Sequence, residues 1–340
     1  MIQLPGGEVA GRAVWQGRDL SNSTAWIRSL SDRERQGLRA ELERVRHADL
    51  RAIDRSDFTA PASFEGIREE LFNGRGFAVL RGLDIDGLST EDAARLFWGL
   101  GLHFGKPLPQ NSKGHLLGHV KDLGLSADDP SVRLYQTNER QHYHTDSCDI
   151  VALMCLQKAR RGGLSSLASS WSAYNEMFTR DPDLAAALFE PIWTDHRGEH
   201  PPGSTPWFSI PIFSWHRGKL IAMYQRRYIE SAQRFPGVPR LGDRQKRAMD
   251  LLDQVLEEIG FHMAFEPGDI QFVHNHQILH DRTAFEDDPQ RPRHLLRLWL
   301  CPERGWELPP VFAERYGNVT AGDRGGIRIP GLPVAASYLP

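Results

Sequence analysis

Two residues with metal-binding side chains, His144 and Asp146, stand two positions apart in the sequence. In an extended segment both side chains leave the same face of the strand, so together they can hold one ion. Pairs of this kind also occur in turns and on surfaces, and alone they indicate a metal site only weakly. A third ligand from another part of the chain is therefore needed.

A candidate for this third ligand is His280, at the end of an expected strand that begins near Gly268. Two histidines and one carboxylate form the facial triad of non-haem Fe(II) oxygenases, which leaves coordination positions open. If the strand runs without a break to His280, then His274 and His276 share its face. On geometry alone, either of these two histidines could be the ligand instead.

Two arginines, Arg293 and Arg297, follow His280 by 13 and 17 residues, and a turn, 162–165, follows the His-x-Asp pair. From about Phe77 to Cys301 this combination resembles the taurine dioxygenase and clavaminate synthase-like superfamily of Fe(II)/2-oxoglutarate-dependent oxygenases. The four elements occur in the order that is typical of that superfamily.

The resemblance implies that His144, Asp146 and His280 hold Fe(II), and that 2-oxoglutarate and O2 are co-substrates. The superfamily's Asn-x-x-x-x-His arrangement, present here as 275–280, favours His280 as the distal ligand. The resemblance also implies that Arg297 binds the distal carboxylate of 2-oxoglutarate.

The turn 162–165 resembles the superfamily's Gly-Gly-x-Ser/Thr turn, which implies that Ser165 helps to hold the carboxylate of 2-oxoglutarate. Ser166 is an equally reachable hydroxyl. The implied fold is α+β, a double-stranded β-helix (jelly roll) core with flanking helices and a long insert between the metal-binding strands.

The implied reaction oxidises an unactivated C–H bond while 2-oxoglutarate is converted to succinate and CO2. Hydroxylation is the expected outcome, and desaturation and cyclisation remain alternatives. The carboxylate of Asp146 argues against a halogenase, because halogenases that resemble this superfamily lack it. A Zn(II)-dependent hydrolase with the same ligand types and a non-catalytic jelly-roll binding protein are the other classes considered.

The substrate is predicted to be a small molecule that bears a carboxylate, such as an amino acid. Its anion is expected to face Arg293, and its polar remainder is expected to face Tyr135, Gln136 or Asn138, which approach the metal-binding pair in sequence. The alternatives are that Arg293 lies on the surface and that the three polar residues satisfy the backbone of a turn.

Composition limits the other classes of partner. The 41 basic and 44 acidic residues give a net charge of −3, and nucleic-acid-binding proteins usually carry a basic stripe. The 3 cysteines form no CxxC pair, which fits a reducing, cytoplasmic setting. The sequence shows neither a signal peptide nor an apolar run of 18 residues. We therefore expect a cytoplasmic protein without a membrane or nucleic-acid partner, and a homo-oligomer is left open.

The chain is expected to form one domain, 1–340, with an N-terminal arm and helix (1–60), a core (76–301) and a C-terminal strap (302–340). Apolar periodicity and end signals predict helices at 31–54, 64–73, 90–101, 171–189 with a break at Asp181-Pro182, and 243–260. Apolar runs predict strands at 76–83, 150–156 and 219–224. A loop-rich segment is expected at 102–134, and an insert at 191–211.

Overall fold

Two main β-sheets, three two-stranded sheets and several helices form in a computed structural model, which describes residues 4–126 and 132–336. Three short pieces of the expected arm, loop and strap (1–3, 127–131 and 337–340) lie outside the described residues. The chain thus has mixed α and β content with a sheet core, in agreement with the α+β prediction.

The larger sheet has seven strands, and most of its pairs are antiparallel. Its order is β1 (Ile27–Ser29), β2 (Phe77–Arg81), β14 (Ile270–His274), β6 (Ile150–Gln157), β17 (His294–Cys301) and β3 (Lys106–Pro107), and β4 (Leu117–Val120) also pairs with β17. The smaller sheet has four strands in the order β13 (Phe261–Met263), β8 (Ser165–Ser169), β15 (Ile278–Arg282) and β5 (Gln141–His144).

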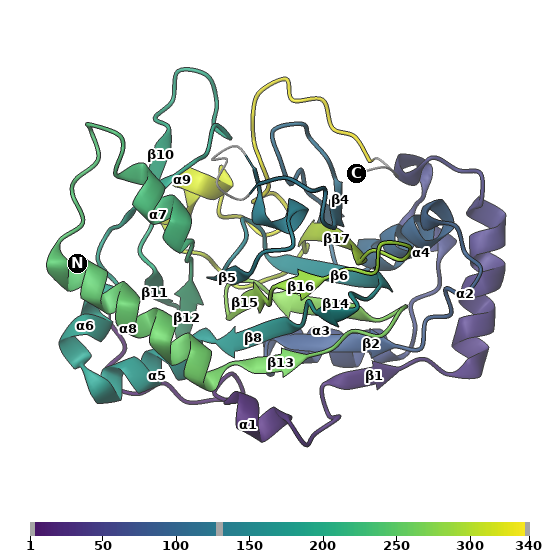
Figure 1. Ribbon diagram of the computed structural model, residues 1–340, viewed down its shortest axis with the longest axis horizontal. Coiled ribbons are helices and arrows are strands. Elements are labelled where there is room, and N and C mark those ends of the chain that lie inside the picture. The colour runs from purple at the N-terminus through teal and green to yellow at the C-terminus, as the bar shows by residue number, and fades with distance from the viewer. Residues whose placement is uncertain (1–3, 127–131, 337–340) are drawn as a thin grey trace.

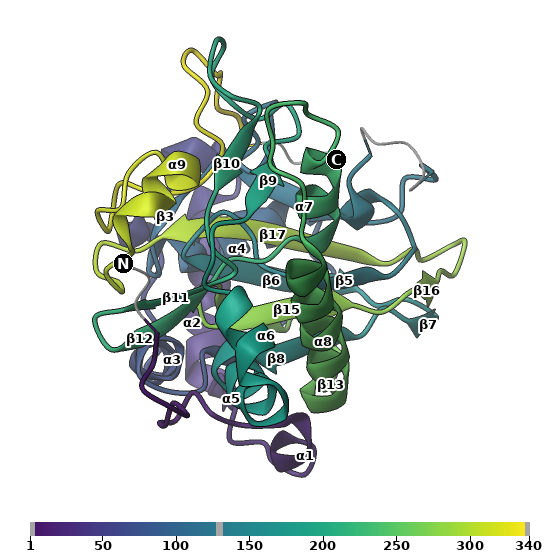
Figure 2. The same ribbon diagram turned by 90° about the vertical axis from the view of Figure 1, so that its left-hand side faces the viewer.

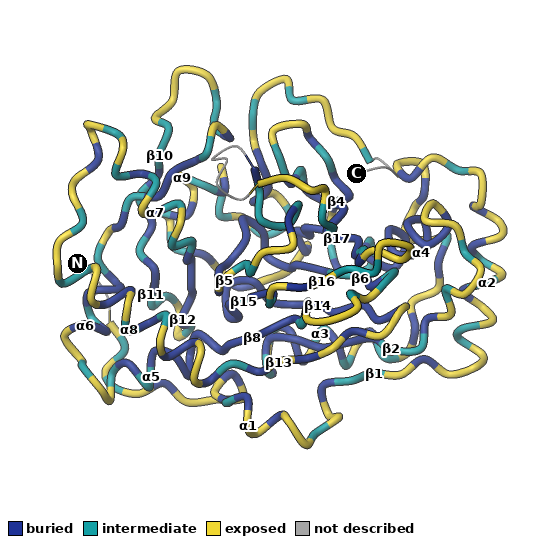
Figure 3. The backbone as a smooth tube through the Cα atoms, in the orientation of Figure 1, coloured by how far each residue is buried: buried dark blue, intermediate teal, exposed yellow. Residues whose placement is uncertain are grey.

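The two sheets lie against each other, as Figures 1 and 2 show. Buried side chains from both sheets form one apolar cluster, in which Phe77, Val151 and Val273 of the larger sheet meet Leu167 and Ile278 of the smaller one. Alternate residues of a strand point to opposite faces of its sheet. The strands of both sheets therefore also present side chains on the faces that point away from this cluster. The burial pattern along the backbone is drawn in Figure 3.

Helices cover the outer faces of the sheets. The first group, α2 (Asp32–Val45), α3 (Ser63–Phe72) and α4 (Thr90–Leu102), packs with the outer face of the larger sheet. The second group, α5 (Ser170–Arg180), α6 (Pro182–Ala187) and α8 (Asp243–Ile259), forms a separate apolar cluster with the insert and the C-terminal segment. A helix forms in each of the five predicted segments, and the break between α5 and α6 lies at Asp181, whose side chain caps α6.

Helix α2 is shorter than predicted and ends at Val45. Two 3₁₀ turns, Leu50–Ala52 and Arg55–Asp57, follow it. Leu50 is fully buried although it lies outside the helix. Its apolar side chain follows the helical spacing, and for this reason the predicted helix extended to residue 54.

The expected insert contains a hairpin of β9 (Trp193–Asp195) and β10 (Trp207–Ser209), and a second hairpin, β11 (Phe213–His216) with β12 (Lys219–Ala222), comes next. A helix that was not predicted, α7 (Arg226–Ala232), follows β12. The remaining short elements are α1 (Gly17–Leu20), β7 (Arg161–Gly162), β16 (Phe285–Glu286), α9 (Ala313–Tyr316), and 3₁₀ turns at Leu134–Gln136 and Pro310–Phe312.

The strand that leads to His280 is not continuous. Strand β14 ends at His274, the chain turns at 275–277, and β15 begins at Ile278. The conditional expectation that His274 and His276 share a strand face with His280 is therefore wrong. His276 instead lies 3.3 Å from Asp149, measured from Nε2 to Oδ1, and the ring of His274 contacts that of Trp306 at 4.3 Å between centroids.

The described part of the C-terminal segment packs against the apolar cluster that contains α5, α6 and α8. Trp306, Phe312 and Tyr316 are buried as expected, and Arg324 is fully buried in an ion pair with Asp149. In the described part of the chain, no helix combines the length and the apolar character that crossing a membrane requires.

Candidate active site

Three side chains suited to a metal ion meet at the junction of β5 and β15. His144 ends β5, and its Cα pairs with that of His280 on β15. Asp146 lies two residues after the end of β5, and ligand atoms of His144, Asp146 and His280 all lie within 4.8 Å of one another. The two imidazole rings are 4.2 Å apart between centroids. The structure therefore brings together the three predicted ligands, and neither His274 nor His276 belongs to this group.

Several contacts fix the position of Asp146. The backbone N–H of Asp146 donates to Asn275 Oδ1 at 2.7 Å, and Trp299 Nε1 donates to Asp146 Oδ2 at 2.8 Å. Arg297 Nη1 lies 3.5 Å from the same carboxylate oxygen. Burial opposes the charge of Asp146, but Arg297 and His280 hold the pKa of this carboxyl below its ordinary value. Asp146 is thus held as a carboxylate, the form that binds metal.

The tautomer of His144 is set by its neighbours. Its Nδ1 lies 2.8 Å from the carbonyl oxygen of His142, which can only accept, so Nδ1 carries the proton. Its Nε2 therefore carries a lone pair, which accepts a hydrogen bond from Gln141 Nε2 at 2.9 Å. Burial, with His280 nearby, lowers the pKa of His144 to about 3. Two imidazoles and a carboxylate, with His144 neutral and Nε2 available, fit a divalent metal.

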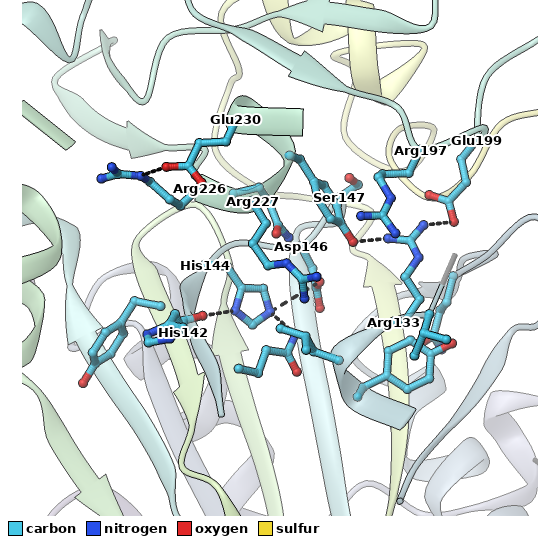
Figure 4. Close-up of a pocket in the computed structure, with 18 of the residues that line it drawn as sticks. Arg133, His142, His144, Asp146, Ser147, Arg197, Glu199, Arg226, Arg227 and Glu230 are labelled. Atoms are coloured by element: carbon cyan, nitrogen blue, oxygen red, sulfur yellow. Dashed lines mark hydrogen bonds and ion pairs between the residues drawn. The ribbon is translucent and has the colours of Figure 1, made fainter. Parts of the chain in front are cut away.

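Two cavities open at this triad. The larger has a volume of about 340 Å³ and is drawn in Figure 4. It is lined by His144, Asp146 and Arg297 together with residues of the insert and α7. The smaller is lined by His144 and His280 and also reaches Ser165, Arg282 and Arg293. Both cavities share Tyr135, Gln141, His144 and Arg297.

Arg293 lies in the smaller cavity. It is only 3% exposed, and its Nη1 has no hydrogen-bond partner among the described residues. Burial lowers the pKa of Arg293 to about 10. Its guanidinium lies 5.2 Å from the ring centroid of Phe285, and Arg282 lies on the same ring at 4.8 Å. A buried cation of this kind is costly unless an anion pairs with it.

The glycine turn makes room for Arg293. Gly163 has a φ of +66°, and a Cβ at this position would lie 2.9 Å from Arg293 Nε. Only glycine meets both conditions without strain. Ser165, two residues later, lines the same cavity, and its Oγ is 3.1 Å from Gln271 Oε1. Ser166 faces elsewhere and contacts His262 Nδ1 at 2.7 Å.

Arg297 lies beside the triad. Its Nε donates to Gln110 Oε1 at 2.7 Å, and its guanidinium carbon lies over the rings of Tyr135 and Trp299, at 4.8 and 5.1 Å from their centroids. Because Arg293 precedes it by four residues, the two arginines start roughly 13 Å apart along the strand direction. They therefore offer positive charge at two separate places.

Of the three expected substrate-facing residues, Tyr135 lines both cavities. Gln136 and Asn138 are not among the described residues that line them. Their carbonyl oxygens accept hydrogen bonds from the backbone of Leu123 and Phe285, at 2.9 and 3.1 Å. These are main-chain hydrogen bonds, and the substrate-facing role of the Gln136 and Asn138 side chains stays a prediction.

Sequence reasoning did not identify most of the larger cavity. The residues it missed include Gln110, Arg133, Gln141, Arg197, Glu199, Arg227, Tyr228 and Arg315. The one local signal was the polar run 225–228 directly after a strand, at the place where a loop or helix end can face a site. The others come from segments far apart in the sequence.

Comparisons with known proteins agree with this site. Residues 42–299 match the family model "Taurine catabolism dioxygenase TauD, TfdA family". FR-33289 synthase of Streptomyces rubellomurinus (strain ATCC 31215) is 32% identical over 342 residues, which cover 94% of this chain and 98% of that protein. A uridine-5'-phosphate dioxygenase of Amycolatopsis sp is 28% identical over 262 residues, 72% of this chain and 90% of that protein.

Solved structures share the fold. The non-haem iron oxygenase OrfP, solved with Fe and alpha-ketoglutaric acid, has a TM-score of 0.60 and 17% identity, and the match covers 81% of this chain and 93% of OrfP. Another structure of OrfP contains Fe, succinate and (3S)-hydroxy-L-Arg.

The chain belongs to the TauD/TfdA family of dioxygenases. It is an Fe(II)- and 2-oxoglutarate-dependent dioxygenase, with a His/Asp triad of the kind that this chemistry requires. The alternatives of a Zn(II) hydrolase and of a non-catalytic binding protein are thereby set aside.

Proposed function

We propose that this dioxygenase hydroxylates a small, carboxylate-bearing molecule, such as an amino acid, that binds in the larger cavity. The observation that carries this proposal is the position of the triad, between a cavity that contains Arg293 and a cavity rich in polar and charged side chains. The hydroxylated arginine bound to OrfP supports an amino acid. The name of the uridine-5'-phosphate dioxygenase supports a small anion more generally.

We assign His144, Asp146 and His280 as the residues that hold Fe(II). When bound with 2-oxoglutarate, this metal supplies the oxidation of the substrate C–H bond. Trp299 and Asn275 keep Asp146 in place, and the carbonyl of His142 keeps the proton of His144 on Nδ1, so that Nε2 would be the atom that binds the metal. We further propose that the two sheets form a double-stranded β-helix within a single domain, since the paired strands β5 and β15 carry ligands from distant parts of the chain.

The two arginines exchange the roles that the sequence suggested. We assign the distal carboxylate of 2-oxoglutarate to Arg293, because its Nη1 is buried without a partner among the described residues and it lines the same cavity as His280. Ser165 lines this cavity as well, and Val151, Leu153 and Leu295 provide apolar walls for the methylene carbons of 2-oxoglutarate.

Arg297 is then placed to serve the substrate. It lines both cavities, lies 3.5 Å from Asp146, and packs on the rings of Tyr135 and Trp299. The planar fork of a guanidinium is suited to a bidentate contact with a carboxylate. We propose that it meets the carboxylate of the substrate close to the metal.

The experiment that tests this assignment is a titration of anaerobic, Fe(II)-loaded enzyme with 2-oxoglutarate, followed by the visible charge-transfer band. Arg293→Gln leaves the distal carboxylate unpaired, at a cost of about 3 kcal/mol or more, so the dissociation constant should rise about a hundredfold. Arg297→Gln should raise it much less, and should instead reduce the succinate release that amino acids and related acids stimulate. If Arg297→Gln raises the dissociation constant for 2-oxoglutarate more than Arg293→Gln does, Arg297 binds the distal carboxylate, as the sequence suggested.

A further inference from the structure

Helix α9, a single turn in the C-terminal segment, contacts both the insert and the loop 145–149, which carries Asp146 and is called the metal loop here. Figures 1 and 2 show α9 beside β10 of the insert. On this side the backbone N–H of Ser209 donates to Glu314 Oε2 at 2.7 Å. On the other side Tyr316 Oη donates to the backbone carbonyl of Asp146 at 3.3 Å. One helical turn therefore lies between two segments that both line the larger cavity.

The side chain of Arg315, on the same helix, joins these two segments directly. Its Nε donates to Ser147 Oγ at 2.8 Å, one residue after Asp146. Its Nη1 donates to the backbone carbonyl of Glu199 at 3.2 Å, and its Nη2 donates to Glu199 Oε2 at 3.3 Å. Nη1 also donates to His196 Nδ1 at 3.1 Å. Each guanidinium nitrogen thus has a protein partner, so Arg315 orients parts of the enzyme instead of binding substrate.

The contacts of Arg315 with the insert are shielded from solvent. The side chains of Arg315 and Glu199 are 8% and 5% exposed. Burial and the charge of Arg315 lower the pKa of His196 to about 3, so this ring is neutral and accepts a hydrogen bond at Nδ1. Separation of the insert from Arg315 would leave two buried charges without each other, which opposes such a movement.

We infer that Arg315 is a positioning residue that couples the insert to the metal loop, so that Fe(II) held by Asp146 also steadies the insert side of the larger cavity. This inference rests on the proposed assignment of His144, Asp146 and His280 to Fe(II), and extends it to the wall of the substrate cavity. A ligand that orders one of two coupled segments reduces the motion of the other, and the coupling is reciprocal.

A second path connects the insert and the metal loop through α7. Asp195 Oδ2 in the insert accepts from Ser231 Oγ at 2.6 Å. Directly before α7, Gln225 Nε2 donates to the backbone carbonyl of Thr145 at 2.7 Å. This path shares no residue with the contacts of Arg315 and crosses a helix between its two ends, whereas Arg315 spans the two segments with one side chain. Replacement of Arg315 therefore tests one path and leaves the other in place.

The test is hydrogen exchange followed by mass spectrometry in the anaerobic wild type, with and without Fe(II). The reporter is the insert peptide with His196 and Glu199, whose backbone N–H groups donate within the insert to the carbonyls of Pro206 and His196, at 2.9 and 3.0 Å. Such amides exchange only when the local structure opens. We expect Fe(II) to slow their exchange at least about fivefold, the lower end of typical coupling between sites. Exchange in β15, which carries His280, should slow as well.

Arg315→Met should abolish the slowing in the insert and keep it in β15, because the three metal ligands are unchanged. A merely structural role of Arg315 would alter exchange equally with and without Fe(II). The matched control is Arg328→Met, in the same C-terminal segment, which breaks a part-exposed pair with Asp323 and should keep both effects of Fe(II). If Arg315→Met does not fold, Ser147→Ala decides in the same way, since it removes only the hydroxyl that Arg315 contacts in the metal loop.

Two results would overturn the inference. One is Fe(II)-dependent slowing of the insert that persists in folded Arg315→Met, which would assign the coupling to the path through α7. The other is a wild type in which Fe(II) slows exchange in β15 and has no effect on the insert. A wild type in which Fe(II) does not slow exchange in β15 would contradict the proposed metal assignment instead.

Discussion

The side chain of Asn275 forms hydrogen bonds with both the backbone N–H and the backbone carbonyl of Asp146. Its Oδ1 accepts the Asp146 N–H at 2.7 Å, and its Nδ2 donates to the Asp146 carbonyl at 2.7 Å and to the Cys148 carbonyl at 2.9 Å. Asn275 is fully buried. Asn275 lies in the turn before β15, the strand that carries His280. Its hydrogen bonds thus connect this turn to the loop that carries Asp146.

Asn275→Ala should weaken Fe(II) binding about 10- to 100-fold, since residues that orient metal ligands typically contribute this much. The matched control is Asn175, which makes the same two-sided clamp on Val9, far from the triad in sequence, with both hydrogen bonds at 2.8 Å. Asn175→Ala should lower stability but leave iron affinity unchanged, as measured by anaerobic equilibrium titration with Fe(II). Equal iron affinities in the two variants would show that the clamp on Asp146 has no role in metal binding.

Arg324→Met tests how the strap is held to the core. Arg324 and Asp149 are both fully buried and paired, and the loss of one partner of such a pair costs about 3 to 5 kcal/mol. Arg328→Met, four residues further on, breaks a part-exposed pair with Asp323 and should cost about 1 kcal/mol or less. The free energy of unfolding from denaturant titration compares the two. A small loss in Arg324→Met would mean that the strap does not depend on this pair.

Stability should fall in acid as Asp149 takes up a proton. Burial opposes the charge of Asp149, but hydrogen bonds from His276 and Arg324 outweigh it and lower its pKa to about 2. The unfolded value is about 3.9, so this contribution of about 2.6 kcal/mol is fully present above about pH 5 and is lost progressively as the pH falls through about 2. The free energy of unfolding, measured over this range, should fall less steeply in Asp149→Asn than in the wild type. If the free energy of unfolding depends on pH in the same way in both proteins, Asp149 does not contribute to the loss of stability in acid.

The sequence was sufficient to predict the triad because its residues stand in a recognisable order with suitable chemistry. It was not sufficient to separate His274, His276 and His280 by periodicity, because the turn at 275–277 contains neither glycine nor proline. That turn is marked instead by Asn275, whose role depends on a contact with Asp146, 129 positions away.

The local sequence pattern was also not sufficient to predict the roles of Arg293 and Arg297. Alternation along a strand places Arg293 and Arg297 on the same side, and only the packed structure shows that Asp146 lies next to Arg297 and that Arg293 is buried against Phe285. In the same way, the contact of Arg133 with Tyr228 joins residues 95 positions apart, which no spacing rule connects.

The most direct test of the account is the visible spectrum of anaerobic enzyme after addition of Fe(II) and 2-oxoglutarate. The wild type should develop a charge-transfer band, because the triad leaves positions for 2-oxoglutarate to chelate the metal. His280→Ala should lose the band and keep its fold. His276→Ala, which changes the nearby histidine that contacts Asp149, should keep the band. A band that persists in His280→Ala and disappears in folded His276→Ala would contradict the assignment of the metal centre.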